Sequence, residues 1–134
     1  MAADTLSKPP AGGRLLILDD DELVGILVET VGRLAGLSTQ RTLHHDAFLA
    51  ALADRGAEPP SHVVIDLTMP GMAGEEVLRE LAAVGCGARI IVCSGADPER
   101  LASAAALAAS LGLRFAGILP KPFAPAALRR LLQA

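Results

Sequence analysis

The stretch that decides the fold spans residues 63–74 and reads VVIDLTMPGMAG. An apolar, β-branched run ends in a single aspartate, Asp66, and a loop with proline and glycine follows. Such a run, bounded by turn residues, predicts a buried strand. In an open α/β sheet, ligands bind at the edge formed by the carboxyl ends of the strands. The sequence therefore predicts that Asp66 is the reactive residue and that the rest of the chain supports it.

Four more segments have the composition of strands, and helical patterns separate them. The predicted strands besides that of Asp66 cover residues 15–18, 37–43, 89–93 and 113–119, and the second of these alternates with polar residues as an edge strand does. The predicted helices cover residues 23–34, 46–52, 77–84, 98–111 and 125–132. Continuous apolar strands that alternate with amphipathic helices predict an α/β fold with a parallel sheet covered on both faces.

Local signals mark several helix ends. Asp46 is a candidate N-cap for the second helix, Asp97 precedes a proline at the start of the fourth, and Gly36 is a candidate C-cap for the first. His44 and His45 are predicted in the loop before the second helix. Because no set of carboxylate or cysteine partners accompanies them in sequence, we interpret both histidines as surface residues and not as metal ligands.

Composition excludes several functions for this chain of 134 residues, which suits one domain. The net charge of −3 and the absence of a dense Lys/Arg cluster argue against direct nucleic-acid binding. No apolar run approaches the length of a membrane span, and residues 1–13 lack the apolar core of a signal peptide, so we expect a flexible leader and a cytoplasmic protein. Cys86 and Cys93 have no metal-ligand spacing and are interpreted as inert thiols.

Polar side chains occur where the predicted strands end. Asp19 and Asp20 follow the first strand, Asp66 ends the third, Ser94 ends the fourth and Lys121 follows the fifth. These carboxyl ends meet at one edge of a parallel sheet, so the side chains are expected to converge. Clustered carboxylates repel unless a cation lies among them, and oxygen ligands of this kind suit Mg²⁺. The residues fit a carboxylate that accepts a phosphoryl group while a metal and a lysine neutralise charge.

Four motifs in register carry a family resemblance. They read LLILDDDE, VVIDLTMPGMAG, IIVCSGA and LPKPF, in that order. With them, residues 14–134 resemble the receiver domain of two-component response regulators. The resemblance implies a flavodoxin-like (βα)5 fold, a doubly wound sheet of five parallel strands in the order 2-1-3-4-5.

The resemblance also implies a role for each site residue. Asp66 is the expected phosphoacceptor, with Asp19, Asp20, Asp66 and the Thr68 backbone carbonyl as the Mg²⁺ ligands. Ser94 and Lys121 are the expected catalytic partners of Asp66, and the Lys121–Pro122 bond is expected to be cis. The implied function is a non-enzymatic one, namely acceptance of a phosphoryl group from a sensor histidine kinase or a phosphotransfer protein. An attached output domain, another protein partner and a homodimer all stay open.

The sequence departs from the family pattern at Ile118, where receivers usually carry an aromatic residue that rotates inward on activation. Residues 94–121 are also longer than the usual segment, which predicts an extended fourth helix. Residues 111–121 resemble receivers that are attached to cyclic-di-GMP phosphodiesterase output domains.

Two other functions were weighed. Asp19 and Asp21 have the Asp-x-Asp spacing of haloacid-dehalogenase-like phosphatases, but no acidic pair follows near a C-terminal strand. A degenerate receiver that acts only in docking or dimerisation is the second alternative. All of the expected site side chains are present, so only Ile118 supports this docking-only alternative. Asp21 itself matches no functional position and is expected to cap a helix.

Overall fold

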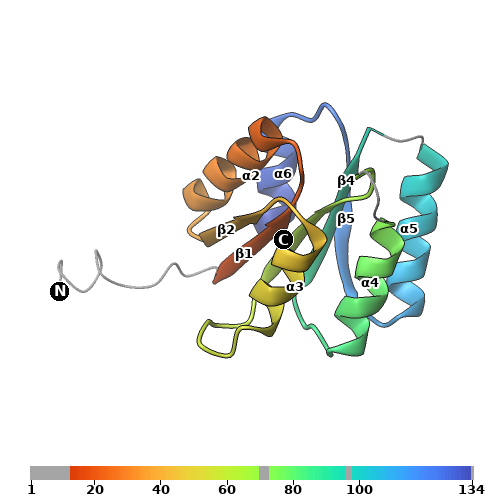
Figure 1. Ribbon diagram of the computed structural model, residues 1–134. Coiled ribbons are helices and arrows are strands. Elements are labelled where there is room, and N and C mark those ends of the chain that lie inside the picture. The colour runs from red at the N-terminus through yellow and green to blue at the C-terminus, as the bar shows by residue number, and fades with distance from the viewer. Residues whose placement is uncertain (1–12, 70–72, 96–97, 134) are drawn as a thin grey trace.

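The computed structural model of the chain describes residues 13–69, 73–95 and 98–133 (Figure 1). The leader expected at residues 1–13 thus lies outside the described residues except for Gly13, and so does the helix-start signal at Asp97.

A single sheet of five parallel strands has the order β2-β1-β3-β4-β5, which confirms the predicted topology. The strands are β1 (Arg14–Leu18), β2 (Ser38–Thr42), β3 (His62–Asp66), β4 (Arg89–Ser94) and β5 (Arg114–Pro120). As predicted, the most polar strand, β2, lies at an edge. Strands β1 and β3 are neighbours from which the chain departs to opposite sides, and such a switch point opens a crevice at the carboxyl edge of the sheet.

Helices cover both faces of the sheet. They are α2 (Glu22–Leu34), α3 (His45–Ala53), α4 (Gly74–Ala83), α5 (Pro98–Ser110) and α6 (Pro125–Gln133). Figure 1 shows α2 and α6 on one face and α3, α4 and α5 on the other. None of the helices in the described parts of the chain is long and apolar enough to cross a membrane.

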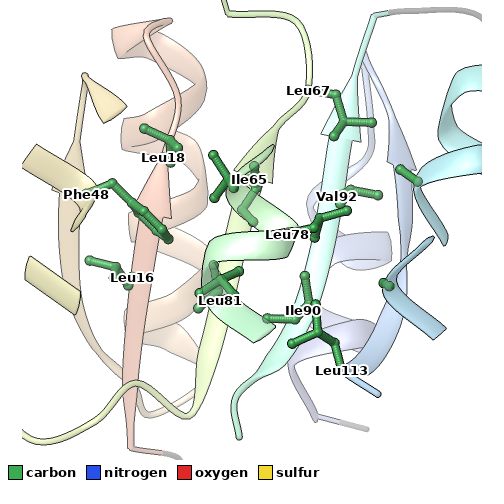
Figure 2. Packing of buried hydrophobic residues seen from close by; sticks show 14 of the residues in the cluster. Leu16, Leu18, Phe48, Ile65, Leu67, Leu78, Leu81, Ile90, Val92 and Leu113 are labelled. Carbon is green, nitrogen blue, oxygen red and sulfur yellow. The ribbon is translucent and has the colours of Figure 1, made fainter. Parts of the chain in front are cut away.

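The strands form two hydrophobic cores, one on each side, because successive side chains of a strand point to opposite faces. In β1, Leu16 and Leu18 pack with Phe48, Leu78 and Leu81 beneath α3, α4 and α5 (Figure 2). The alternate residues of β1 pack with Val28 and Leu128 beneath α2 and α6. A strand end between two filled cores has little freedom, so side chains placed there are held firmly.

Helix α2 buries only some of its apolar residues against the sheet. Leu23 and Leu34 are 79% and 68% exposed, whereas the buried positions are Gly25, Val28, Val31 and Gly32. A Cβ atom at Gly32 would lie 2.7 Å from Leu15 Cδ2, so the missing side chain lets the helix approach the sheet closely. Small residues decided the orientation of the helix here, and an apolar pattern alone does not reveal them.

Two local predictions for α3 were wrong. The helix begins earlier than expected, so Asp46 lies in the first turn and His44 occupies the N-cap position without a side-chain hydrogen bond. His45 belongs to the helix, and its Nε2 lies 2.5 Å from Glu80 Oε1 of α4. That carboxylate lies 35 residues away in sequence, which is why no local pattern reveals the pair.

The other capping predictions agree with the structure. The Asp21 carboxylate accepts hydrogen bonds from the backbone N–H groups of Leu23 and Val24 and so caps α2. Gly36, directly after the C-cap of that helix, has a φ of 90°, a conformation that glycine adopts without strain.

Candidate functional site

The predicted convergence at the carboxyl edge of the sheet is observed. Asp19 directly follows β1, Asp66 is the last residue of β3, Ser94 is the last residue of β4 and Lys121 directly follows β5. Asp19, Asp66 and Ser94 are buried, although they are polar. Buried polar groups need partners, so the contacts among these residues decide what the site can do.

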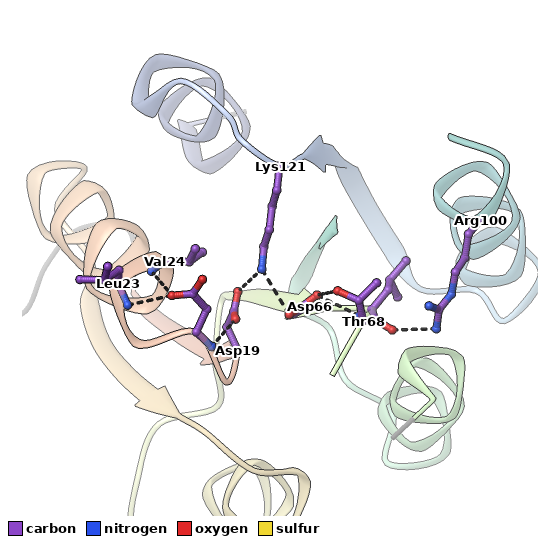
Figure 3. Close-up of polar contacts among 9 residues, drawn as sticks. Asp19, Leu23, Val24, Asp66, Thr68, Arg100 and Lys121 are labelled. Atoms are coloured by element: carbon purple, nitrogen blue, oxygen red, sulfur yellow. Dashed lines mark hydrogen bonds and ion pairs between the residues drawn. The ribbon is translucent and has the colours of Figure 1, made fainter. Parts of the chain in front are cut away.

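Lys121 bridges the two buried carboxylates (Figure 3). Its Nζ lies 3.0 Å from Asp19 Oδ2 and 3.2 Å from Asp66 Oδ2. The backbone N–H of Lys121 donates to the Ser94 carbonyl oxygen at 2.9 Å, which holds the lysine at the end of β4. The Lys121–Pro122 peptide bond is cis, as predicted. One ammonium group thus faces both carboxylates from a fixed position.

The two ends of the Asp19–Lys121 pair differ in their electrostatics. Burial raises the pKa of the Asp19 carboxyl above its usual value, and it outweighs the hydrogen bond from the Asp21 N–H and the ion-pair contact with Lys121. Burial by itself would lower the pKa of Lys121, but the ion-pair contact with Asp19 and the other nearby negative charges raise it overall. The lysine is therefore held in its charged form, while Asp19 lacks part of the solvation that a carboxylate needs.

Asp19 also holds an unsatisfied oxygen. Its Oδ1 accepts the Asp21 N–H at 2.9 Å. Its Oδ2 is buried, and its contact with Lys121 lacks the geometry of a hydrogen bond, so it is the one buried side-chain oxygen or nitrogen of the described residues that has no hydrogen-bond partner. A buried oxygen of this kind has room for a further partner, such as an ion or a water molecule.

Asp66 is oriented by Thr68. The backbone N–H and the side-chain hydroxyl of Thr68 donate to Asp66 Oδ1 at 2.9 and 2.8 Å. The sequence suggested only the backbone carbonyl of Thr68, so the hydroxyl contact was missed. The signal was present, because a threonine two residues after an aspartate can satisfy that carboxylate in a tight turn.

Asp20 completes an acidic cluster with Asp19 and Asp66. One oxygen from each carboxylate lies within 4.8 Å of the others, and Asp20 itself is exposed to solvent. A cluster of oxygen donors that includes an unsatisfied oxygen fits a hard divalent cation such as Mg²⁺. The residues present therefore fit the metal that the family resemblance implies.

Asp21, by contrast, is not part of this acidic cluster. Its carboxylate is engaged with the N–H groups at the start of α2. The Asp-x-Asp pair of the phosphatase alternative therefore lacks its second acid.

Ser94, the remaining candidate side chain, is fully buried at the end of β4. Burial raises the pKa of the neighbouring Cys93 thiol to about 12, so that this cysteine stays protonated and unreactive, as predicted.

One contact to the loop after β3 was not foreseen. Arg100 of α5 donates from Nη2 to the Leu67 carbonyl oxygen at 2.7 Å, and it also contacts the Glu75 carboxylate of α4. No sequence pattern connects residues 33 positions apart. The hydrogen bond from Arg100 holds the pKa of the Glu75 carboxyl below its usual value.

Sequence relatives agree with this geometry. Residues 15–133 match the model of the response regulator receiver domain family. Over 114 residues the chain is 34% identical to the transcriptional regulatory protein FixJ of Azorhizobium caulinodans, with 84% of this chain and 49% of that protein covered. It is 32% identical over 111 residues to the response regulator MprA of Mycobacterium avium, with 83% of this chain and 45% of that protein covered. The chain therefore spans about half the length of the curated relatives it matches.

Solved structures share the fold. A response regulator from Colwellia psychrerythraea superposes with a TM-score of 0.76 at 33% identity, covering 92% of this chain and 95% of that one. A CheY-like receiver domain protein from Methanospirillum hungatei superposes with a TM-score of 0.74 at 21% identity, covering 90% of each chain. The order of the strands, the acidic cluster at the switch point and the family match agree, and the chain belongs to the receiver domain family of response regulators.

Proposed function

We propose that Asp66 accepts a phosphoryl group from the phosphohistidine of a sensor histidine kinase or a phosphotransfer protein, and that this changes the affinity of the domain for a partner. The observation that carries the proposal is the Lys121 ammonium group, which faces the buried carboxylates of both Asp19 and Asp66. The single positive charge of this half-buried lysine neutralises the two carboxylates only in part, which suits a site that takes up a further cation.

The two oxygens of Asp66 have different surroundings. Oδ1 accepts both hydrogen bonds from Thr68, while Oδ2 faces Lys121 at 3.2 Å. Oδ2 therefore keeps the more available lone pairs and is the oxygen proposed to attack phosphorus. The bond between phosphorus and the donor imidazole nitrogen breaks, its electron pair stays on the imidazole, and an acyl phosphate forms on Asp66. Lys121 neutralises the charge that the phosphoryl oxygens carry during the transfer.

A divalent cation fits beside the acceptor. Asp19, Asp20 and Asp66, together with the backbone carbonyl of Thr68, would hold Mg²⁺. When bound, the cation supplies positive charge next to the phosphoryl oxygens. The unsatisfied Oδ2 of Asp19 supports this assignment, because a cation there would compensate for the solvation that the buried carboxylate has lost.

We propose that phosphorylation of Asp66 changes the partner surface by moving the strand ends that carry Ser94 and Lys121. An acyl phosphate adds a charge of about −1.5 to −2, which attracts the lysine and offers oxygens to the serine hydroxyl. A shift of β4, β5 and α5 then alters the surface that a partner contacts. Ile118 replaces the usual aromatic residue and is 38% exposed, so the movement is proposed to depend on Ser94 and Lys121 and not on rotation of a ring.

Setting and partners follow from the same proposal. A phosphohistidine donor places the protein in the cytoplasm, where such kinases present their catalytic parts. The resemblance of residues 111–121 favours a cyclic-di-GMP phosphodiesterase as the output partner, whether attached or separate.

Incubation with acetyl phosphate and MgCl2, followed by intact-mass measurement, tests the proposal. The wild type gains one phosphoryl group, while Asp66→Asn gains none. Asp54→Asn is the matched control, because Asp54 is an exposed aspartate outside the acidic cluster, and it labels like the wild type. Chelation of Mg²⁺ with EDTA suppresses labelling.

Two results would contradict the proposal. Equal labelling of the wild type and Asp66→Asn would remove Asp66 as the acceptor. Absence of label on every variant, with the fold intact, would favour a domain that acts only in docking or dimerisation.

A further inference from the structure

Arg100 of helix α5 reaches the loop after β3 (Figure 3). Nη2 of Arg100 lies 2.7 Å from the Leu67 carbonyl oxygen, and its Nε and Nη2 each lie 3.3 Å from a Glu75 carboxylate oxygen. Leu67 directly follows Asp66. A cation on α5 therefore reaches the backbone next to the proposed acceptor.

A single peptide group links Arg100 to Asp66. The carbonyl of the Leu67–Thr68 peptide accepts the hydrogen bond from Arg100, and the N–H of the same peptide donates to Asp66 Oδ1 at 2.9 Å. A peptide group is planar, so the direction of its carbonyl fixes the direction of its N–H. A charged donor on the carbonyl also polarises the group and strengthens the hydrogen bond that its N–H makes.

The surroundings leave Leu67 little freedom to compensate. Its N–H donates to the Cys93 carbonyl of β4 at 3.0 Å, and its side chain is fully buried. Helix α4 begins against it, because a Cβ atom added to Gly74 would lie 2.8 Å from the Leu67 Cα. With the residue held on these sides, rotation of the Leu67–Thr68 peptide is the movement that loss of Arg100 would allow.

We propose that Arg100 is a positioning residue for phosphoryl transfer to Asp66. It holds the Leu67–Thr68 peptide with its N–H toward Asp66 Oδ1, which turns Oδ2 toward Lys121. Glu75 orients the guanidinium from α4 by a two-atom contact. Since Arg100 lies on α5, the position of that helix and the reactivity of Asp66 are coupled, and a partner that displaces α5 slows transfer. The inference rests on the proposed role of Asp66.

The test combines phosphorylation rates with the amide signal of Thr68 in a ¹⁵N–¹H spectrum. Arg100→Ala slows labelling by acetyl phosphate by about tenfold, the effect of losing one charge-assisted hydrogen bond. The amide proton of Thr68 moves upfield in this variant because its hydrogen bond weakens. Arg100→Lys keeps a charged donor and recovers most of the rate and of the shift. If Arg100→Ala does not fold, Arg100→Gln takes its place.

Two control variants separate positioning from general stability. Arg79→Ala removes an arginine–glutamate contact that lies within α4, where Arg79 Nη1 is 3.2 Å from Glu76 Oε1. This variant labels within about twofold of the wild type. Glu75→Gln is the second variant, because it removes the charge that orients Arg100 and leaves the Leu67 carbonyl contact available, and it labels at a rate between those of the wild type and Arg100→Ala.

The outcomes are distinguishable. A wild-type rate in Arg100→Ala overturns the inference and leaves the role of Asp66 intact. A slow rate with an unchanged Thr68 signal, or equal slowing by Arg79→Ala, also overturns it. If the wild type takes no label on Asp66, the proposed function fails, and the Thr68 signal alone then decides whether Arg100 orients the peptide.

Discussion

The strands of the sheet have acidic residues at their carboxyl ends and basic residues at their amino ends, here called the carboxyl edge and the amino edge. The charged groups at the two edges have different kinds of partner. At the carboxyl edge, Asp19 and Asp66 share one ammonium group, and a buried oxygen of Asp19 has no hydrogen bond. At the amino edge, four of the strands begin with a basic residue, namely Arg14, His62, Arg89 and Arg114. The same backbone thus presents an acidic end and a basic end.

Two of these basic groups hydrogen-bond to neighbouring parts of the chain. Arg14 donates to the Glu58 carbonyl oxygen at 2.8 Å and to the side chain of Gln40. His62 Nδ1 shares a hydrogen bond of 2.8 Å with the hydroxyl of Ser61. Within the described residues, no carboxylate lies within ion-pair distance of Arg89 or Arg114. The comparison shows that buried polarity alone does not mark a site, whereas like charges that share a single counter-charge do.

The largest expected effect comes from removing that counter-charge. Lys121→Met leaves two buried carboxylates without a cation and lowers the free energy of unfolding at pH 7 by about 3 kcal/mol. The loss is smaller at acidic pH, where protonated carboxylates need no counter-charge. Urea unfolding at both pH values measures it.

The amino edge provides the control for Lys121. Arg114→Met removes an exposed cation and changes the free energy of unfolding by less than about 0.5 kcal/mol. Similar losses in the two variants would show that the edges do not differ in the way described.

A glycine at each edge gives the second test. Gly74→Ala places a Cβ 2.6 Å from Leu67 Cδ2 and 2.8 Å from its Cα, so that the start of α4 must move, at a cost of about 2 kcal/mol. Gly87→Ala, in the turn before β4, meets no atom within 4 Å and should be nearly neutral. Thermal unfolding of the two variants measures the difference. A neutral Gly74→Ala would mean that the loop after β3 is less tightly held than its contacts indicate.

The smallest effect concerns pH at the amino edge. Burial, followed by the charges of Arg89 and Arg114, lowers the pKa of His62 below its ordinary value of 6.5, in spite of a hydrogen bond with the Leu132 backbone. The unfolded chain therefore binds a proton more readily. The contribution of His62 to stability is complete above about pH 6.5 and is lost as the pH falls through the folded pKa.

His62→Gln should remove this part of the pH dependence. Urea unfolding at pH 5.5 and 7.5 then shows a smaller difference for the variant than for the wild type, while His44→Gln, an exposed control, keeps the wild-type difference. An unchanged difference in His62→Gln would mean that the histidine keeps its ordinary pKa.

The sequence by itself determined the architecture and the composition of the site. Continuous apolar runs could be buried only between two layers of helices, and each reactive residue follows directly on such a run. Where a strand ends is a local property, so the places of Asp66 and Lys121 could be predicted. The capping role of Asp21 could be predicted for the same reason, since its partners lie two and three residues away.

Only the tertiary structure decided the features that depend on contacts between distant residues. The shared ammonium of Lys121, the unsatisfied oxygen of Asp19 and the contact of Arg100 with Leu67 each join elements far apart in the chain. Other features that the sequence did not reveal have the same origin, because glycines set the face of α2 and Glu80 pairs with His45 across two helices. The periodic pattern of apolar residues indicates which residues favour burial. Tertiary packing decides which of them are buried and which charged side chains come into contact.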